Sequence, residues 1–206
     1  MVRSIFTLAA AFGLALAQSN YPNQSAPFNL VLSSENSTLD GLQLGACHSG
    51  AAVESLCVFA NITTPQFLTF YFNGSAEAPT NPGYLPAGLL TWTFTGGIPE
   101  FTQNTAMTFM YNTASNLAFP LIWPSDANSQ AISFTDDGLL AVAANINDTL
   151  DPPEPFDNYV TYITDRWAIC KTYWQAYDYT ALQFVLGDQK PQNPSCEYVK
   201  VKRVFL

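Results

Sequence analysis

Aromatic residues near the C-terminus are the part of this chain best suited to recognising a ligand. The segment 173–179 holds one glutamine, one aspartate and four rings, at Tyr173, Trp174, Tyr177 and Tyr179. Sugars stack their apolar C–H faces on such amphipathic rings, while amide and carboxylate groups bond the sugar hydroxyls. The four rings are therefore candidate carbohydrate contacts, and Trp123 is a second aromatic candidate. The alternative is that these rings pack in the core or as cross-strand pairs.

Nucleophilic catalysis has little support in the sequence. His48 is the only histidine, and Ser49 follows it directly. A serine nucleophile needs an imidazole within hydrogen-bond reach, but adjacent residues of an extended chain point to opposite faces. The chain also lacks the G-x-S-x-G turn that presents such a serine. We therefore interpret His48 as a loop residue between two half-cystines.

Acidic residues are numerous enough to form pairs by chance. The chain has 16 of them, and two carboxyl groups are the minimal requirement for glycoside hydrolysis. The densest group consists of Asp136, Asp137, Asp148, Asp151, Glu154 and Asp157. No D-x-[DN]-x-[DN]-G loop organises this group for Ca²⁺, and no C-x-x-C pair is present for zinc. We expect a solvated acidic edge, and we predict no catalytic residue, no metal site and no cofactor.

Charge is distributed very unevenly along the chain. Residues 18–165 contain no lysine and no arginine, and six cations lie between Arg166 and Arg203. Extended contact with phosphates needs Lys or Arg, so the pattern excludes nucleic acid as a partner. On a C-terminal strand, Lys200 and Lys202 would share one face. We expect these cations to face the protein's own acidic group rather than an external acidic polymer.

The first 17 residues have the features of a secretory signal. Arg3 provides the positive charge, residues 5–16 are apolar, and Ala15-Leu16-Ala17 is a cleavage site of the A-x-A type. The apolar run is too short to span a membrane. We expect a signal peptide at 1–17 and a single mature domain at 18–206. The mature protein should be secreted to the extracellular space or cell wall, with no membrane partner.

Sequons and cysteines agree with this location. Five N-x-S/T sequons are predicted glycosylation sites, at Asn23, Asn36, Asn61, Asn73 and Asn147. Each needs an exposed backbone in the secretory lumen. The four cysteines are an even set, which predicts two disulfides in an oxidising compartment. Three pairings are possible. Because near neighbours meet most easily in the folding chain, we favour the local pairing of Cys47 with Cys57 and Cys170 with Cys196.

The periodicity of the apolar residues is that of strands. Leu90, Trp92 and Phe94 alternate with threonines, and Asp136-Asp137-Gly138 predicts a hairpin turn. Strands are predicted at 28–32, 67–72, 90–95, 107–111, 132–135, 139–143, 159–163, 167–172, 180–186 and 198–205. No capped helical run exceeds about two turns. The pattern predicts an all-β, single-domain antiparallel β-sandwich or related two-sheet fold with two disulfides.

A spaced pattern in the C-terminal third resembles a known group of proteins. It consists of Trp167-Ala-Ile-Cys170, the aromatic segment 173–179, Leu182, Gly187, Pro191-Gln-Asn-Pro-Ser-Cys196 and the strand 199–204. Together with Leu44–Ala52, this pattern resembles a group of small secreted fungal proteins of unknown function, and the similarity extends from Pro27 to the end of the chain. The resemblance implies a secreted, β-rich, disulfide-bonded domain and assigns no catalytic residue.

Three functions are compatible with these observations. We favour a secreted, non-enzymatic, acidic β-rich glycoprotein, associated with the cell wall or extracellular matrix of a fungus. One alternative is a carbohydrate-binding, lectin-like module that uses the aromatic segment and has cell-wall polysaccharide as its partner. The other is a glycoside hydrolase with a carboxylate pair. No feature of the sequence indicates an oligomeric state.

Overall fold

The computed structural model describes residues 20–59, 64–75, 78, 81–125, 127–144, 146–155 and 162–206. At positions 147, 154 and 155 only the backbone is described. The predicted signal peptide and the sequon at Asn61 lie outside the described residues, so both stay predictions.

Alternation of apolar and polar residues gives strands along most of the described chain. The strands are β1 (Asn23–Gln24), β2 (Phe28–Ser33), β3 (Gln43–Gly50), β4 (Val53–Phe59), β5 (Phe70–Gly74), β6 (Gly88–Gly96), β7 (Phe101–Tyr111), β8 (Leu117–Trp123), β9 (Ile132–Phe134), β10 (Leu140–Ala144), β11 (Ile146–Asn147), β12 (Glu154–Pro155), β13 (Tyr162–Thr164), β14 (Trp167–Trp174), β15 (Tyr177–Val185) and β16 (Glu197–Phe205). One short 3-10 turn, η1 (Pro65–Leu68), is the helical element among the described residues.

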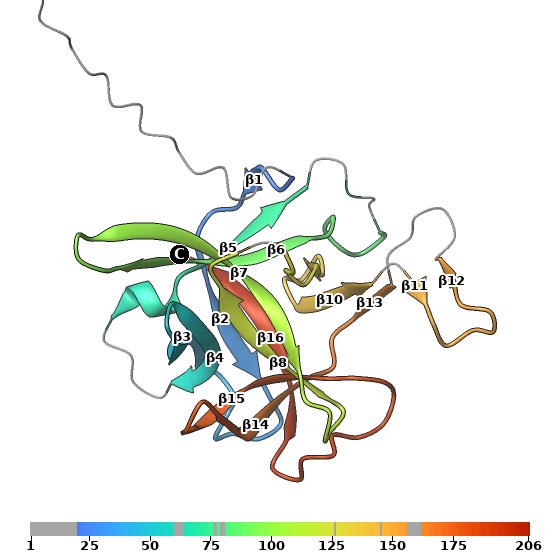
Figure 1. The fold of residues 1–206 in the computed structure, drawn as a ribbon. Helices are drawn as coiled ribbons and strands as arrows, with labels where there is room; N and C mark the ends of the chain where they lie inside the picture. Colours follow the sequence, from blue (N-terminus) through green and yellow to red (C-terminus); the bar gives the residue numbers. More distant parts are fainter. Residues whose placement is uncertain are drawn as a thin grey trace, which may run out of the picture.

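The strands form one large sheet of 14 strands, with β11 and β12 in a separate ribbon that projects from the rest of the fold (Figure 1). The pairings from β2 through β16, β14, β15, β8, β7, β6 and β5 lead back to β2, so the sheet closes on itself. β3 and β4 add a second link between β2 and the β8–β15 pair. These pairings are antiparallel, and the predicted all-β antiparallel fold class is confirmed.

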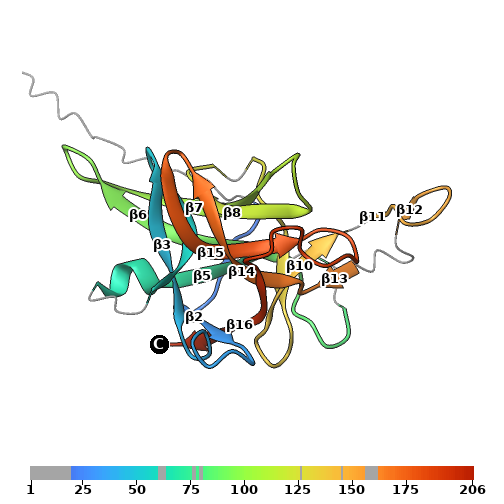
Figure 2. The same cartoon turned by 90° about the horizontal axis from the view of Figure 1, so that it is seen from below.

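The sheet is strongly curled (Figures 1 and 2), and side chains from most of its strands form the main apolar core. Trp167, Phe28 and Phe134 are completely buried there, and the Phe28 and Phe134 rings meet edge to face with 5.5 Å between their centroids. Two smaller apolar clusters lie on the other face of the same strands, because side chains alternate along a strand. This second face of β8, β14 and β15 carries the site described below.

One hairpin of the sheet was predicted correctly from its turn residues, and another was predicted wrongly as a loop. The turn at Asp136-Asp137-Gly138 joins β9 and β10 as predicted, and Gly138 has a φ of +83°, which glycine adopts without strain. In contrast, the residues between Cys47 and Cys57, interpreted as a loop, form the hairpin of β3 and β4, so His48 is a strand residue. The Gly, Ala and Ser residues there have weak strand propensity, which pairing of β4 with β8 and β15 overrides.

The local disulfide pairing is confirmed. Cys47 and Cys57 join β3 to β4 with their Cα atoms 6.0 Å apart. Cys170 and Cys196 tie β14 to the segment before β16, with Cα atoms 4.1 Å apart. Two disulfides are compatible with an extracellular protein. Within the described ranges, no helix has the length and apolar character to cross a membrane.

The described sequons occupy different environments. Asn23 is exposed in β1, and Asn36 is half-buried in the turn after β2. Asn73 in β5 is only 5% exposed, and its Oδ1 accepts a hydrogen bond from the Thr91 hydroxyl at 3.0 Å. The backbone of Asn147 lies in β11. A glycan needs an exposed amide, so this fold favours Asn23 and Asn36 over Asn73 as acceptors, and glycosylation stays a prediction at all of them.

Candidate ligand-binding cleft

A cleft of about 450 Å³ opens on the second face of the sheet, where the turn between β7 and β8 approaches the end of β14. β8 and β15 form its floor, and one wall comes from the loop before β16. The described residues that line it are aromatic, aliphatic, amide or hydroxyl types, and none of them is Asp, Glu, Lys, Arg or His. The cleft is therefore polar but uncharged.

Strand register places Phe119 and Gln183 together in the floor. Ala118 pairs with Phe184 across β8 and β15, so Phe119 and Gln183, each one residue away from this pair, point to the opposite face. Phe184 packs in the main core, whereas Phe119 and Gln183 line the cleft and are 6% and 3% exposed. One ring and one amide thus lie side by side at the base of the cleft.

Trp174 forms an aromatic wall whose orientation is fixed by two contacts. Its indole N–H donates to the backbone oxygen of Ser49 at 3.1 Å. Its ring meets Phe119 with 5.8 Å between the centroids and an interplanar angle of 66°. A ring that is already held in place loses little conformational freedom when a ligand stacks on it.

The four aromatic residues predicted as one carbohydrate surface are divided by the hairpin of β14 and β15. Trp174 pairs with Tyr177, and Tyr173 pairs with Asp178. Tyr173, which is 69% exposed, and Trp174 both line the cleft. Tyr177, 62% exposed, and Tyr179 do not line it, and Tyr179 donates its hydroxyl to the backbone oxygen of His48 at 2.8 Å. Carbohydrate contact stays a prediction for all four.

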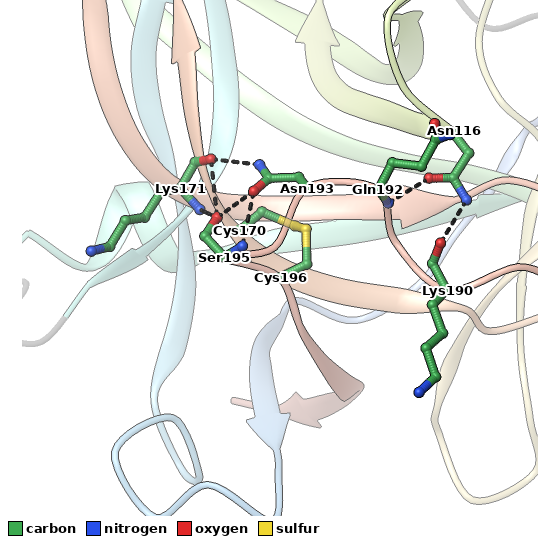
Figure 3. Close-up of a disulfide and its surroundings, with 8 residues drawn as sticks. All are labelled: Asn116, Cys170, Lys171, Lys190, Gln192, Asn193, Ser195 and Cys196. Carbon is green, nitrogen blue, oxygen red and sulfur yellow. Dashed lines mark hydrogen bonds between the residues drawn. A yellow bond between two sulfur atoms is a disulfide. The ribbon is translucent and has the colours of Figure 1, made fainter.

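The 191–196 loop is clamped against β14 by the Cys170–Cys196 disulfide and by hydrogen bonds (Figure 3). Asn193 donates its side-chain N–H to the backbone oxygen of Lys171 at 2.9 Å. Asn116 holds the other end, because its Oδ1 accepts the backbone N–H of Gln192 at 2.9 Å. The amide of Asn193 therefore has a structural role, while the exposed side chain of Gln192 stands at the wall of the cleft.

The amide of Gln183 is a buried donor without a partner. Its Nε2 makes no hydrogen bond to any described residue. Leaving such a donor unpaired costs about 1–3 kcal/mol, so native folds keep few of them. A side-chain amide both donates and accepts. Gln183 lines the floor of the cleft, so rotation of its side chain would present this amide to a ligand that brings its own polar atoms.

His48 and Ser49 do not form a catalytic pair. His48 pairs with Glu54 across β3 and β4, whereas the buried Ser49 donates its hydroxyl to Oγ of Ser55 at 2.8 Å. Burial raises the pKa of Glu54, and the charge of His48 acts in the opposite direction. Neither His48 nor Glu54 lines the cleft.

None of the charged side chains that the structure describes lines the cleft. In the part of the chain that the structure describes, no three His, Cys, Asp or Glu residues are placed to hold one metal ion. Arg166 pairs with Asp188 at 2.5 Å, and Lys200 pairs with Asp165. Both of these acids lie outside residues 136–157, so the cation pairs that the structure records differ from the expected ones.

Sequence reasoning missed most of the cleft. The turn residues of β7 and β8 carry no recognisable motif, and their approach to β14 is a tertiary contact. One feature of the sequence did indicate the cleft. Gln183 is the polar residue inside the apolar run from Ala181 to Val185. A polar residue in a strand that is otherwise apolar on both faces indicates a special environment.

Comparison with known proteins places the fold in a family. No curated protein and no solved structure matches the chain. A family model described as a domain of unknown function, DUF7907, matches residues 25–205 and so includes β2 to β16, with every strand around the cleft. The resemblance to an uncharacterised family is confirmed at this level. The chain belongs to the DUF7907 family.

Proposed function

We propose that this chain is an exported, non-catalytic glycoprotein that binds neutral carbohydrate in the cleft between the β7–β8 turn, β14 and the 191–196 loop. The observation that carries this proposal is a fixed tryptophan ring beside an unpaired buried amide in an uncharged cleft. A sugar ring presents an apolar C–H face and uncharged hydroxyl groups, which are the complement of such a surface.

The neutrality of the cleft stands out in so acidic a protein. The chain has a formal net charge of −9, yet no described residue that lines the cleft is charged. An anionic ligand would meet no Lys or Arg there and would be repelled by the net charge of the protein. A cationic ligand would meet no carboxylate. An uncharged polar ligand is the class that fits.

Hydrolysis of the bound sugar has less support than binding alone. Glycosidases use one carboxylic acid and a second carboxyl group on either side of the scissile bond. The described lining of the cleft contains neither. Glu54 has the raised pKa that a general acid needs, but it lies outside the cleft. We therefore assign the site to recognition.

Export is supported by features of the chain that are independent of the cleft. These features are the apolar N-terminal segment with its A-x-A site, the sequons and the two disulfides. An exported binding protein for neutral sugars finds its ligands in cell-wall or matrix polysaccharide. We take the wall of a fungus as the setting, because the C-terminal pattern resembles small secreted fungal proteins.

A glycan array combined with a polysaccharide-hydrolysis screen tests the proposal. We expect binding to neutral glycans and no release of sugar. Tyr173→Ala should weaken binding about 3- to 10-fold, because it removes an exposed stacking surface without opening the core. Tyr177→Ala is the matched control, since this exposed ring is on the same hairpin but outside the cleft. Sugar release, or an equal loss of binding in both variants, contradicts the proposal.

A further inference from the structure

We infer that the binding site continues from the cleft along β7 and β8 to Trp123, and that its ligand is a linear oligosaccharide rather than a single sugar. The inference rests on the proposed function of the cleft. A second hollow of about 310 Å³ lies beyond the cleft, and Trp123, Thr108 and Asn128 are among the residues that line it. None of its described lining residues is charged.

Met110 connects the two hollows. It lines both of them and is 39% exposed. Met110 pairs with Phe119, and Ala106 pairs with Trp123, so Met110, Phe119 and Trp123 project from one face of the β7–β8 pair. The two hollows are therefore neighbouring parts of the same surface.

The spacing along β8 determines how long a ligand must be to reach both hollows. Trp123 lies four residues beyond Phe119, which corresponds to about 13 Å along a strand. This distance exceeds the length of one hexose ring. A ligand that touches both Phe119 and Trp123 therefore contains at least two linked sugars.

Trp123 differs from the other tryptophans in the hydrogen bonding of its indole N–H. The indole N–H groups of Trp92, Trp167 and Trp174 each donate to a backbone oxygen, at 2.9, 2.8 and 3.1 Å. No described residue accepts the indole N–H of Trp123, and the side chain is 40% exposed. Its ring can stack on a sugar while its N–H bonds a hydroxyl group.

The backbone around Trp123 is held in place before any ligand arrives. The side-chain amide of Gln103 donates to the backbone oxygen of Pro124 at 2.7 Å, directly after Trp123. The hydroxyl of Thr108 donates to the backbone oxygen of Asn128, also at 2.7 Å. A site that is already ordered pays less conformational entropy on binding. The described lining residues at both ends are uncharged and already ordered, which fits one polymer.

A length series of oligosaccharides tests the extended site. The probes are β-1,3-glucan, β-1,4-glucan and N-acetylglucosamine oligomers from dimer to hexamer, with dissociation constants measured by calorimetry. We expect the hexamer to bind more tightly than the dimer. Trp123→Ala should weaken hexamer binding about 3- to 10-fold and leave dimer binding unchanged. Tyr173→Ala should weaken both, and Tyr198→Ala, which removes an exposed ring elsewhere, should weaken neither.

Nuclear magnetic resonance gives a second readout at the residue itself. The indole N–H signal of Trp123, assigned with Trp123→Phe, should shift on addition of hexamer and stay in place with dimer. The extended site is contradicted if dimer and hexamer bind with equal affinity, or if Trp123→Ala binds the hexamer as tightly as the wild-type protein does. Neither result contradicts binding in the cleft itself. If the wild-type protein binds no oligomer of any length, the proposed function fails and the extended site fails with it.

Discussion

Two concave surfaces of this molecule differ in whether their polar side chains already have hydrogen-bond or ion-pair partners. The first is the neutral cleft on β8, β14 and β15. The second is a charged groove of about 780 Å³ at the end of β2 and the start of β16, whose lining includes Glu35, Asp165, Arg166, Glu197 and Lys200. The groove is the larger of the two. Four of these five charged groups, however, already have a partner.

Pairing within the charged groove leaves little for a ligand. Lys200 pairs with Asp165, and the side-chain N–H of Asn36 donates to Glu197 at 2.5 Å. In the neutral cleft, Gln183 is buried with its Nε2 unpaired. The smaller hollow is therefore the one that combines an unsatisfied buried amide with a fixed aromatic ring, and this combination is the reason for proposing it as the site.

The largest expected effect distinguishes the disulfide that clamps the cleft wall from the one that packs beneath the cleft. Removing Cys170–Cys196, with a sequence separation of 26, should lower the free energy of unfolding by about 3.5 kcal/mol on the chain-entropy model and weaken glycan binding by freeing the 191–196 loop. Removing Cys47–Cys57, with a separation of 10, should cost about 2.7 kcal/mol and weaken binding less, because this bridge packs beneath Phe119 and Trp174 but does not hold the 191–196 wall. Thermal unfolding and glycan titration of the two double Cys→Ala variants measure this. An equal loss of binding in both would remove the special role of the cleft wall.

Gln183→Leu tests whether the unpaired amide is kept for a ligand. Because the variant removes an unpaired buried donor, its free energy of unfolding should stay constant or rise by about 1 kcal/mol. Glycan affinity should fall about tenfold. Denaturant unfolding and calorimetry measure the two quantities. Thr105→Val is the control, because its buried hydroxyl already donates to the backbone oxygen of Trp92 at 2.8 Å, and its loss should lower stability without changing affinity.

Changing the pH should affect folding through Glu54 and leave the cleft unaffected. Burial raises the pKa of Glu54 in the folded protein. Its contribution to stability is therefore fully present below the unfolded pKa of about 4.3 and is lost as the pH rises through the folded pKa. Glu54→Gln should raise stability by about 1 kcal/mol at neutral pH and have little effect near pH 3, as measured by denaturant unfolding. Glycan affinity should be constant from about pH 4 to pH 8, because no described lining residue is Asp, Glu or His.

The smallest expected effect belongs to the charged groove. Lys200→Gln breaks an exposed ion pair with Asp165, so the free energy of unfolding should fall by at most about 1 kcal/mol at low salt and hardly at all at high salt. Binding of neutral glycans should not change. If Lys200→Gln abolished binding while Tyr173→Ala did not, the charged groove would replace the neutral cleft as the site.

Several features of this protein were decided by its sequence alone. Strand periodicity indicated the all-β class, and Asp136-Asp137-Gly138 marked the β9–β10 hairpin because a tight turn needs glycine at positive φ. Proximity in the chain indicated the pairing of Cys170 with Cys196. These are local properties, and local energetics are sufficient to specify them. The mixed segment from Cys47 to Cys57 had no strong local preference, so its strands could not be predicted.

The cleft was decided by tertiary structure. A strand pattern tells which residues alternate but not which of its two faces another element will cover. Only the pairing of β8 with β15 brings Phe119 beside Gln183, and only the course of β3 places the Ser49 oxygen where it orients Trp174. The aromatic segment 173–179 was visible in the sequence, but which of its rings line the cleft depended on distant contacts such as that of Trp174 with Ser49, 125 residues away in the sequence. Long-range register, rather than composition, made a site from these residues.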